Sequence, residues 1–110
     1  MNESSLNEIE AKIRGAENLS EERKRELLQL LGTLKTEVGK LSQTHDEEAQ
    51  SIAGFAQLSA HEATRAQRNP QSLHHSLEGL RSSVEGFEKS HPKLVQIVNN
   101  ISNTLANLGI

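Results

Sequence analysis

The chain has 110 residues, of which 34% are hydrophobic and 25% charged, with a formal net charge of −3 at pH 7 and no cysteine. This length supports one modest core, so we expect a single domain over residues 1–110, and the lack of cysteine excludes disulfides and thiolate metal sites. Because neither half carries a basic stripe and no stretch approaches the roughly 20 apolar residues of a membrane span, we expect a cytoplasmic protein that binds neither nucleic acid nor membranes.

Apolar residues at helical spacing predict a short first helix over residues 3–17. Ser20 is a suitable N-cap for a second helix from about 21 to 43, with Glu21 and Glu22 in its positively polarised first turn. The apolar residues of this second helix recur at alternating gaps of four and three, which is typical of a coiled-coil packing seam. They are Leu27, Leu31, Leu34, Val38 and Leu41.

A third helix is expected over about 46–67. Thr44 and Glu47 have the spacing of a capping box, which favours a new helix start there. The apolar register of the second helix nevertheless continues to Ile52 and Phe55, so one long helix through residue 44 is the alternative.

Alanine forms a regular stripe along this third helix, beside Ile52, Phe55 and Leu58. Its members are Ala49, Ala53, Ala56, Ala60 and Ala63. Helix propensity alone could explain so much alanine, but small side chains in strict register also allow a second helix to approach closely. Two other lines of small residues could supply the facing surface. They are Gly79, Ser83, Gly86 and Ser90, and the shorter line Gly32, Thr36 and Gly39.

The C-terminal half predicts two further helices. Asn69 and Pro70 form an N-cap followed by proline at the first helical position, opening a helix over about 70–90. Pro92 disfavours helical dihedrals at His91, so we expect a structural junction at Phe87, His91 and Pro92 and a last helix over 92–108. With no period-two alternation, the sequence predicts an all-α fold, either a helical bundle or a long helical hairpin of amphipathic helices, completed by oligomerisation.

Motifs for catalysis are missing from the sequence, and no cofactor is expected. Glu88 and His91 form one Glu-x-x-His step of the kind that di-iron bundles use, but such sites need two steps and further inward carboxylates. A metal-binding bundle or metal-dependent enzyme using Glu88 and His91, with His45 and either Glu48 or Glu62, is therefore the alternative function rather than the preferred one.

The segment from His74 to the end resembles the C-terminal part of a family of small bacterial proteins known only as a domain of unknown function. Its pattern is a Phe-Glu-x-x-His-Pro block followed by an amphipathic helix that ends in Gly-Ile. The matching residues are Phe87, Glu88, His91, Pro92, Gly109 and Ile110. The resemblance implies a bacterial cytosolic source and carries no activity, cofactor or catalytic residue.

After Lys93 the chain has no charged side chain, and asparagine, serine and threonine fill the polar side of the last helix. Uncharged amides can be buried without the desolvation cost of an ion, so we expect this side to be covered by another copy, with Gly109 and Ile110 packed at the same place. The candidate interface joins the alanine stripe to Asn100, Ile101, Asn103, Leu105 and Leu108. The preferred function is a non-catalytic helical interaction module that self-associates, with any other protein partner unknown.

Overall fold

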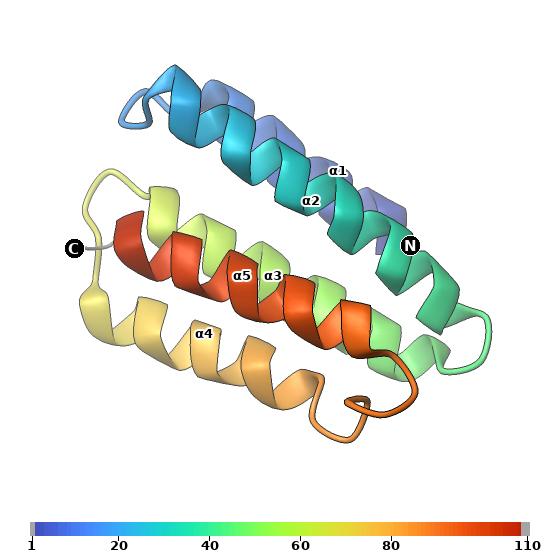
Figure 1. Cartoon of the computed structure of the whole chain (residues 1–110). Coiled ribbons are helices and arrows are strands. Elements are labelled where there is room, and N and C mark those ends of the chain that lie inside the picture. The colour runs from blue at the N-terminus through green and yellow to red at the C-terminus, as the bar shows by residue number, and fades with distance from the viewer. Residues whose placement is uncertain (1, 109–110) are drawn as a thin grey trace.

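The structure, a computed structural model, describes residues 2–108 and contains five helices and no strand in that range. The helices are α1 (Asn2–Gly15), α2 (Glu21–Ser42), α3 (Asp46–Thr64), α4 (Pro70–Ser83) and α5 (Pro92–Leu108), shown in Figure 1. The predicted all-α fold is confirmed. Gly109 and Ile110, expected to pack beside the last helix, lie outside the described residues.

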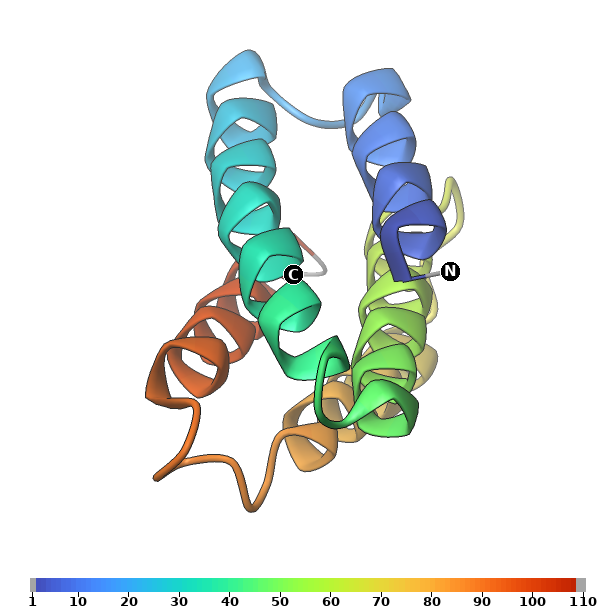
Figure 2. The ribbon, with the colours of Figure 1, turned by 90° about the vertical axis from the view of Figure 1, so that its right-hand side faces the viewer.

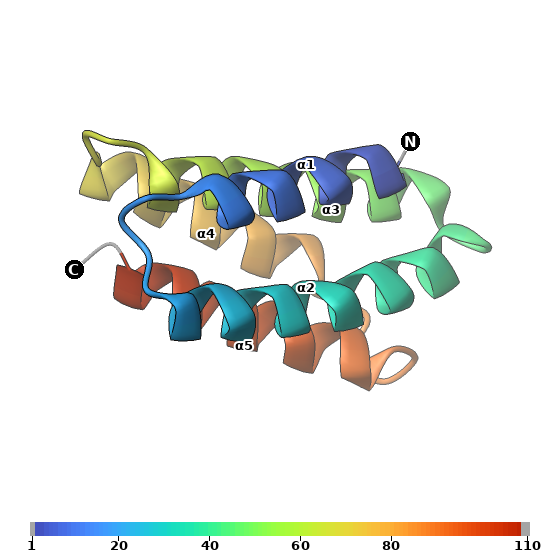
Figure 3. The ribbon, with the colours of Figure 1, turned by 90° about the horizontal axis from the view of Figure 1, so that it is seen from above.

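Successive helices run in opposite directions, so α1, α3 and α5 point one way and α2 and α4 the other (Figures 1 and 3). Contacts between neighbours close a ring in the order α1, α2, α5, α4, α3, which can be followed in the oblique view of Figure 2. The bundle measures 37 × 24 × 21 Å. Across the described residues, α3 is the one helix that contacts all four others.

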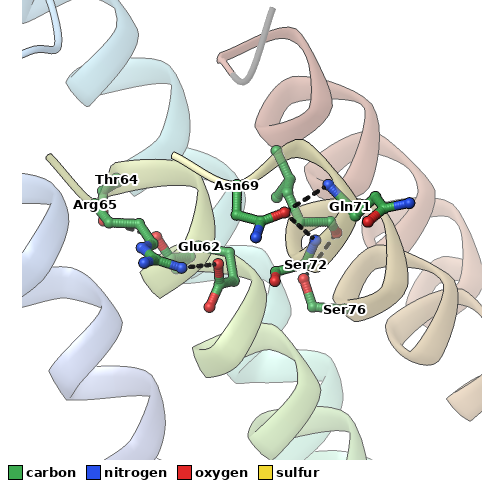
Figure 4. Close-up of polar contacts among 9 residues, drawn as sticks. Glu62, Thr64, Arg65, Asn69, Gln71, Ser72 and Ser76 are labelled. Carbon is green, nitrogen blue, oxygen red and sulfur yellow. Dashed lines mark hydrogen bonds and ion pairs between the residues drawn. The ribbon is translucent and has the colours of Figure 1, made fainter. Parts of the chain in front are cut away.

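Side-chain caps fix the start of two helices where the sequence predicts them. The Ser20 hydroxyl accepts a hydrogen bond from the backbone N–H of Arg23 at 3.1 Å. Asn69 Oδ1 accepts from the backbone N–H groups of Gln71 and Ser72 at 3.0 and 3.1 Å, with Pro70 as the first helical residue (Figure 4). Both caps satisfy N–H groups that have no partner within the first helical turn.

The chain turns between α2 and α3, so the single long helix is excluded, but the predicted capping box is wrong. The Thr44 hydroxyl instead donates to the carbonyl oxygen of Leu41 at 3.4 Å, and His45 stands at the N-cap without a side-chain cap bond. The turn therefore depends on local backbone bonds, such as His45 N–H to Leu41 O at 2.8 Å.

The first helix, expected over 3–17, ends at Gly15, and two later helices end three or more residues earlier than predicted. The helix expected over 46–67 ends at Thr64, because Arg65 is extended with ψ of 150°. The helix expected over 70–90 ends at Ser83, and Gly86 has φ of 96°, a left-handed conformation that glycine adopts without strain. The segment between α4 and α5 is thus a loop of residues 84–91, longer than the single junction that the sequence predicts.

All five alanines of the stripe are at most 2% exposed. Ala56 and Ala60 border the same small apolar space as Ile9 and Ile13 of α1, and α2 and α5 close this space from the other sides. The large side chains around the stripe can approach because alanine leaves room for them. The alanine stripe is therefore covered by helices of its own chain.

The lines of small residues behave differently from one another. A Cβ at Gly79 would lie only 2.4 Å from Cε1 of Phe55, so this glycine lets α4 approach the α3 side chain. Gly32, Thr36 and Gly39 are exposed on α2, so they do not supply the surface that faces the buried alanine stripe. The spacing alone could not separate these cases, since both lines have helical periodicity.

Two buried hydroxyls lack a hydrogen-bond partner among the described residues. They belong to Ser59 of α3 and Ser102 of α5, both 0% exposed, on two helices that contact each other. Ser76 of α4 is almost as buried, but its hydroxyl donates to the carbonyl oxygen of Leu73 at 2.8 Å (Figure 4). An unpaired buried hydroxyl costs free energy, whereas a paired one does not.

Replacing Ala56 by Leu should lower the free energy of unfolding by about 1–3 kcal/mol, because the added methylene groups have no space inside the bundle. Urea unfolding measures the change. Ala11→Leu, on the exposed side of α1, is the matched control and should be nearly neutral. Equal midpoints for both variants would contradict the tight contact.

Replacing Ser59 by Ala should raise the free energy of unfolding by about 1 kcal/mol, because it removes an unpaired hydroxyl from the core. Ser76→Ala brings the same gain in helix propensity as Ser59→Ala but also loses a hydrogen bond. Its free energy of unfolding should therefore be lower than that of Ser59→Ala. Thermal unfolding of both variants gives the comparison. A loss of stability in Ser59→Ala, equal to that of Ser76→Ala, would show that the Ser59 hydroxyl is paired.

Candidate interaction surfaces

The outer side of α5 is a strip of exposed amides, here called the asparagine strip: Asn99, Asn100, Asn103 and Asn107. Lys93, in the first turn, is the one charged residue of this helix. At one edge of the strip, Arg81 of α4 donates from Nη2 to Asn103 Oδ1 over 3.4 Å. The polar side of α5 thus faces outward in the single chain and presents donors and acceptors without charge.

Most apolar members of the candidate interface are not available on the surface. Ile101 and Leu105 are buried in the chain's own core, and Leu108 is half-buried. The alanine stripe is buried as well. Of the residues predicted for contact between copies, Asn100 and Asn103 are the exposed ones, so an interface on α5 must use its amides.

Sequence reasoning missed the exposed side of α3. Among the described residues, the large hydrophobic side chains that are more than a third exposed are Phe55 at 38% and Leu58 at 46%. Both had been assigned beside the alanine stripe. The available signal was an excess of apolar residues around α3, more than one buried face can hold, with no charged residue between Ala49 and His61.

The predicted structural junction gathers three rings from two loops. Phe87 lies 5.4 Å from His45 and 5.7 Å from His91, and the two histidine rings lie 6.4 Å apart, measured between ring centroids. All three pairs are edge-on, with interplanar angles of 81–87°. Such geometry is typical of packed aromatic rings. This ring cluster joins the turn before α3 to the loop before α5, and the sequence had not placed His45 in it.

A neighbouring hydroxyl contacts one ring nitrogen of each histidine at the junction, and a backbone N–H contacts the Glu88 carboxylate. Nδ1 of His45 lies 2.8 Å from the Thr44 hydroxyl, and Nδ1 of His91 lies 3.0 Å from the Ser90 hydroxyl. The Glu88 carboxylate accepts a hydrogen bond from the backbone N–H of Gly86 at 2.8 Å. Glu88 therefore stabilises the left-handed turn at Gly86.

The carboxylates named in the metal alternative do not converge. Glu62 is 8% exposed and pairs at 2.9 Å with Arg65, the C-cap of the same helix (Figure 4), while Glu48 lies in the first turn of α3. Among the side chains that the structure describes, those of residues 6–108, no three or more from histidine, aspartate or glutamate are placed to hold a metal ion. The single Glu-x-x-His step thus gains no further ligands from the fold.

A shallow cleft of about 490 Å³ lies at the opposite end of the bundle. Lys12 and Glu17 border it from the α1 side, and His61 and Arg65 border it from α3. The C-terminal ends of the parallel helices α1 and α3 meet here, where basic side chains offset the negative ends of the helix dipoles. The mixed charges around the cleft therefore follow from its position at the C-terminal ends of two helices.

None of the helices over residues 2–108 combines the length and apolar character needed to cross a membrane.

The family model described as Domain of unknown function (DUF4404) matches residues 27–110. The matched region includes α3, α4, α5 and most of α2, while α1 precedes it. No curated protein and no solved structure matches the chain.

A double-mutant cycle should show that Phe87 and His45 stabilise each other. Phe87→Leu and His45→Leu should each lower the free energy of unfolding, with a coupling of about 0.5–1.5 kcal/mol, the usual value for an aromatic pair. Urea unfolding of the two single variants and the double variant gives the coupling. Strictly additive effects would contradict an energetic role for the ring contact.

Proposed function

This chain belongs to the DUF4404 family of domains of unknown function, and we propose that it is a non-catalytic helical interaction module that self-associates through the asparagine strip of α5. The observation that carries this proposal is the composition of an exposed helical face. Exposed helix positions normally carry lysine and glutamate, which favour both helix and solubility. The asparagine strip has neither, although asparagine is a poorer helix former.

Amides suit a surface that is covered part of the time. Burying a charged side chain is costly unless it is paired, whereas an amide can exchange hydrogen bonds with water for bonds with a partner. Each asparagine both donates and accepts, so a face of asparagines is complementary to itself. Pairing about a two-fold axis would therefore place the asparagine strip of one copy against that of another.

A catalytic or metal-dependent role has no comparable support. The histidines near Glu88 pack against Phe87, and Glu88 itself accepts a bond from the loop backbone. The proposal also keeps the bacterial, cytoplasmic setting expected from the sequence and leaves any partner other than a second copy unnamed.

The test is to place charges on the strip with Asn100→Lys and Asn103→Glu in one chain. Light scattering after gel filtration should give a multiple of 12.1 kDa for the native protein and a mass closer to 12.1 kDa for the variant, because burying the new charges opposes pairing. Circular dichroism should show an unchanged helix content.

Thr33→Lys with Thr36→Glu is the matched control, since it places the same charges three residues apart on the exposed side of α2. The control should keep the native mass. A native chain that is monomeric, or an Asn100/Asn103 variant with the native mass, would overturn this proposal.

A further inference from the structure

A second exposed line runs along α3, here called the α3 seam. Its members recur at alternating gaps of four and three: Glu47, Ser51, Gly54, Leu58, His61 and Arg65. The first five are exposed, and the Arg65 side chain is 39% exposed. Alternating gaps of this kind place the first five residues in one line on α3, the arrangement that packs against another helix, and Arg65 follows them as the C-cap. α1 and α4 flank this line, since both contact α3.

The middle of the α3 seam has a notch beside a projecting side chain. No other part of the described structure comes within 4 Å of a Cβ built on Gly54, so the surface above it is open. Leu58, one turn further along, is 46% exposed. Phe55 lies against Gly79 of α4 and extends the apolar surface sideways. A leucine next to an empty glycine position forms a knob and a hole on the same helix.

We propose that the α3 seam is a second self-association surface, on which α3 of another copy lies antiparallel with each Leu58 over Gly54 of its partner. The proposal extends the proposed function, since the partner is again a copy of this chain, but it uses a different helix. Burial of the exposed leucine and phenylalanine surface provides the driving force.

Charge complementarity selects a second copy in the antiparallel orientation. With Leu58 opposite Gly54, the same register sets Ser51 opposite His61 and Glu47 opposite Arg65. The acidic first turn of one α3 then meets the basic end of the other. A parallel pair would instead set Glu47 against Glu47 and Arg65 against Arg65, and like charges in direct contact are unfavourable.

The charges on the α3 seam also argue against a strongly charged partner. One acid stands at one end and one base at the other, and the positions between them carry no aspartate, glutamate, lysine or arginine. An acidic or basic ligand would therefore gain attraction at one end and lose it at the other. A copy of the chain in the antiparallel orientation instead gains attraction at both ends of the α3 seam, which offsets part of the repulsion between two molecules that each have a net charge of −3.

The first experiment fills the notch. Gly54→Gln adds bulk above α3 without adding charge, and its Cβ would enter open space. Gly39→Gln is the matched control, because Gly39 is also exposed in a helix with open space above it. Light scattering should show a twofold lower mass for Gly54→Gln and the native mass for Gly39→Gln, with both variants fully helical by circular dichroism. An unchanged mass in Gly54→Gln would overturn the proposal.

The second experiment uses the absence of native cysteine. The double variant Ser51→Cys/His61→Cys should give a disulfide-linked dimer on a non-reducing gel after mild oxidation, since each cysteine would meet the other type across the pair. Within one chain these positions lie ten residues apart, about 15 Å along the helix, too far for a disulfide. Each single variant should stay unlinked. No dimer from the double variant, or equal linking in a single variant, would overturn the antiparallel pairing.

The two surfaces can be separated by combining variants. If linking of Ser51→Cys/His61→Cys persists when Asn100→Lys and Asn103→Glu are added, the α3 seam pairs on its own. If the Asn100/Asn103 variant lowers the mass while Gly54→Gln does not, self-association through the asparagine strip is supported and pairing through the α3 seam is contradicted. If Gly54→Gln alone lowers the mass, pairing through the α3 seam is supported and self-association through the asparagine strip is contradicted.

Discussion

The fold depends on how closely other helices can approach α3. This helix contacts all four others, which is possible because it turns alanines of at most 2% exposure toward them. Bulkier residues there would force the neighbouring helices apart, since packed cores rarely absorb added methylene groups without strain. Alanine contributes little apolar area itself, so the stabilising area comes from the leucine and isoleucine side chains that surround it.

The use of alanine on the inner face of α3 also affects the outer side of this helix. A small inner face leaves the larger apolar residues of the helix at its margin or outside, where Phe55 and Leu58 lie. The Phe55 ring packs against α4 because Gly79 has no side chain. Leu58 lies beside the open notch at Gly54. The exposed apolar surface and the close internal packing are therefore two results of the same distribution of residue sizes.

The periodicity of apolar residues was sufficient to predict the fold class. The capping residues Ser20 and Asn69 were sufficient to predict two helix starts, because capping is a local interaction. It failed where the outcome depends on tertiary neighbours. Gly32 and Gly79 each belong to a line of small residues at helical spacing, yet one faces solvent and the other lies under a ring. The end of α4 also escaped prediction, since helical spacing continues through Phe87 while the backbone turns at Gly86. The exposed position of Leu58 could not be read from spacing for the same reason.

The asparagine strip and the α3 seam lie on different helices, with α4 between them in the ring. Both fall inside residues 27–110, the region that the family model matches, whereas α1 precedes it. The helices α2, α3, α4 and α5 also close a ring of contacts without α1. If both proposed interfaces form, their two two-fold axes would combine to give either a closed tetramer or an open chain of copies. Which of these would form depends on the angle between the two axes, and that angle would be set by the packing of α3 and α5 against each other and against α4. The contacts inside the bundle would thus determine the geometry of assembly outside it.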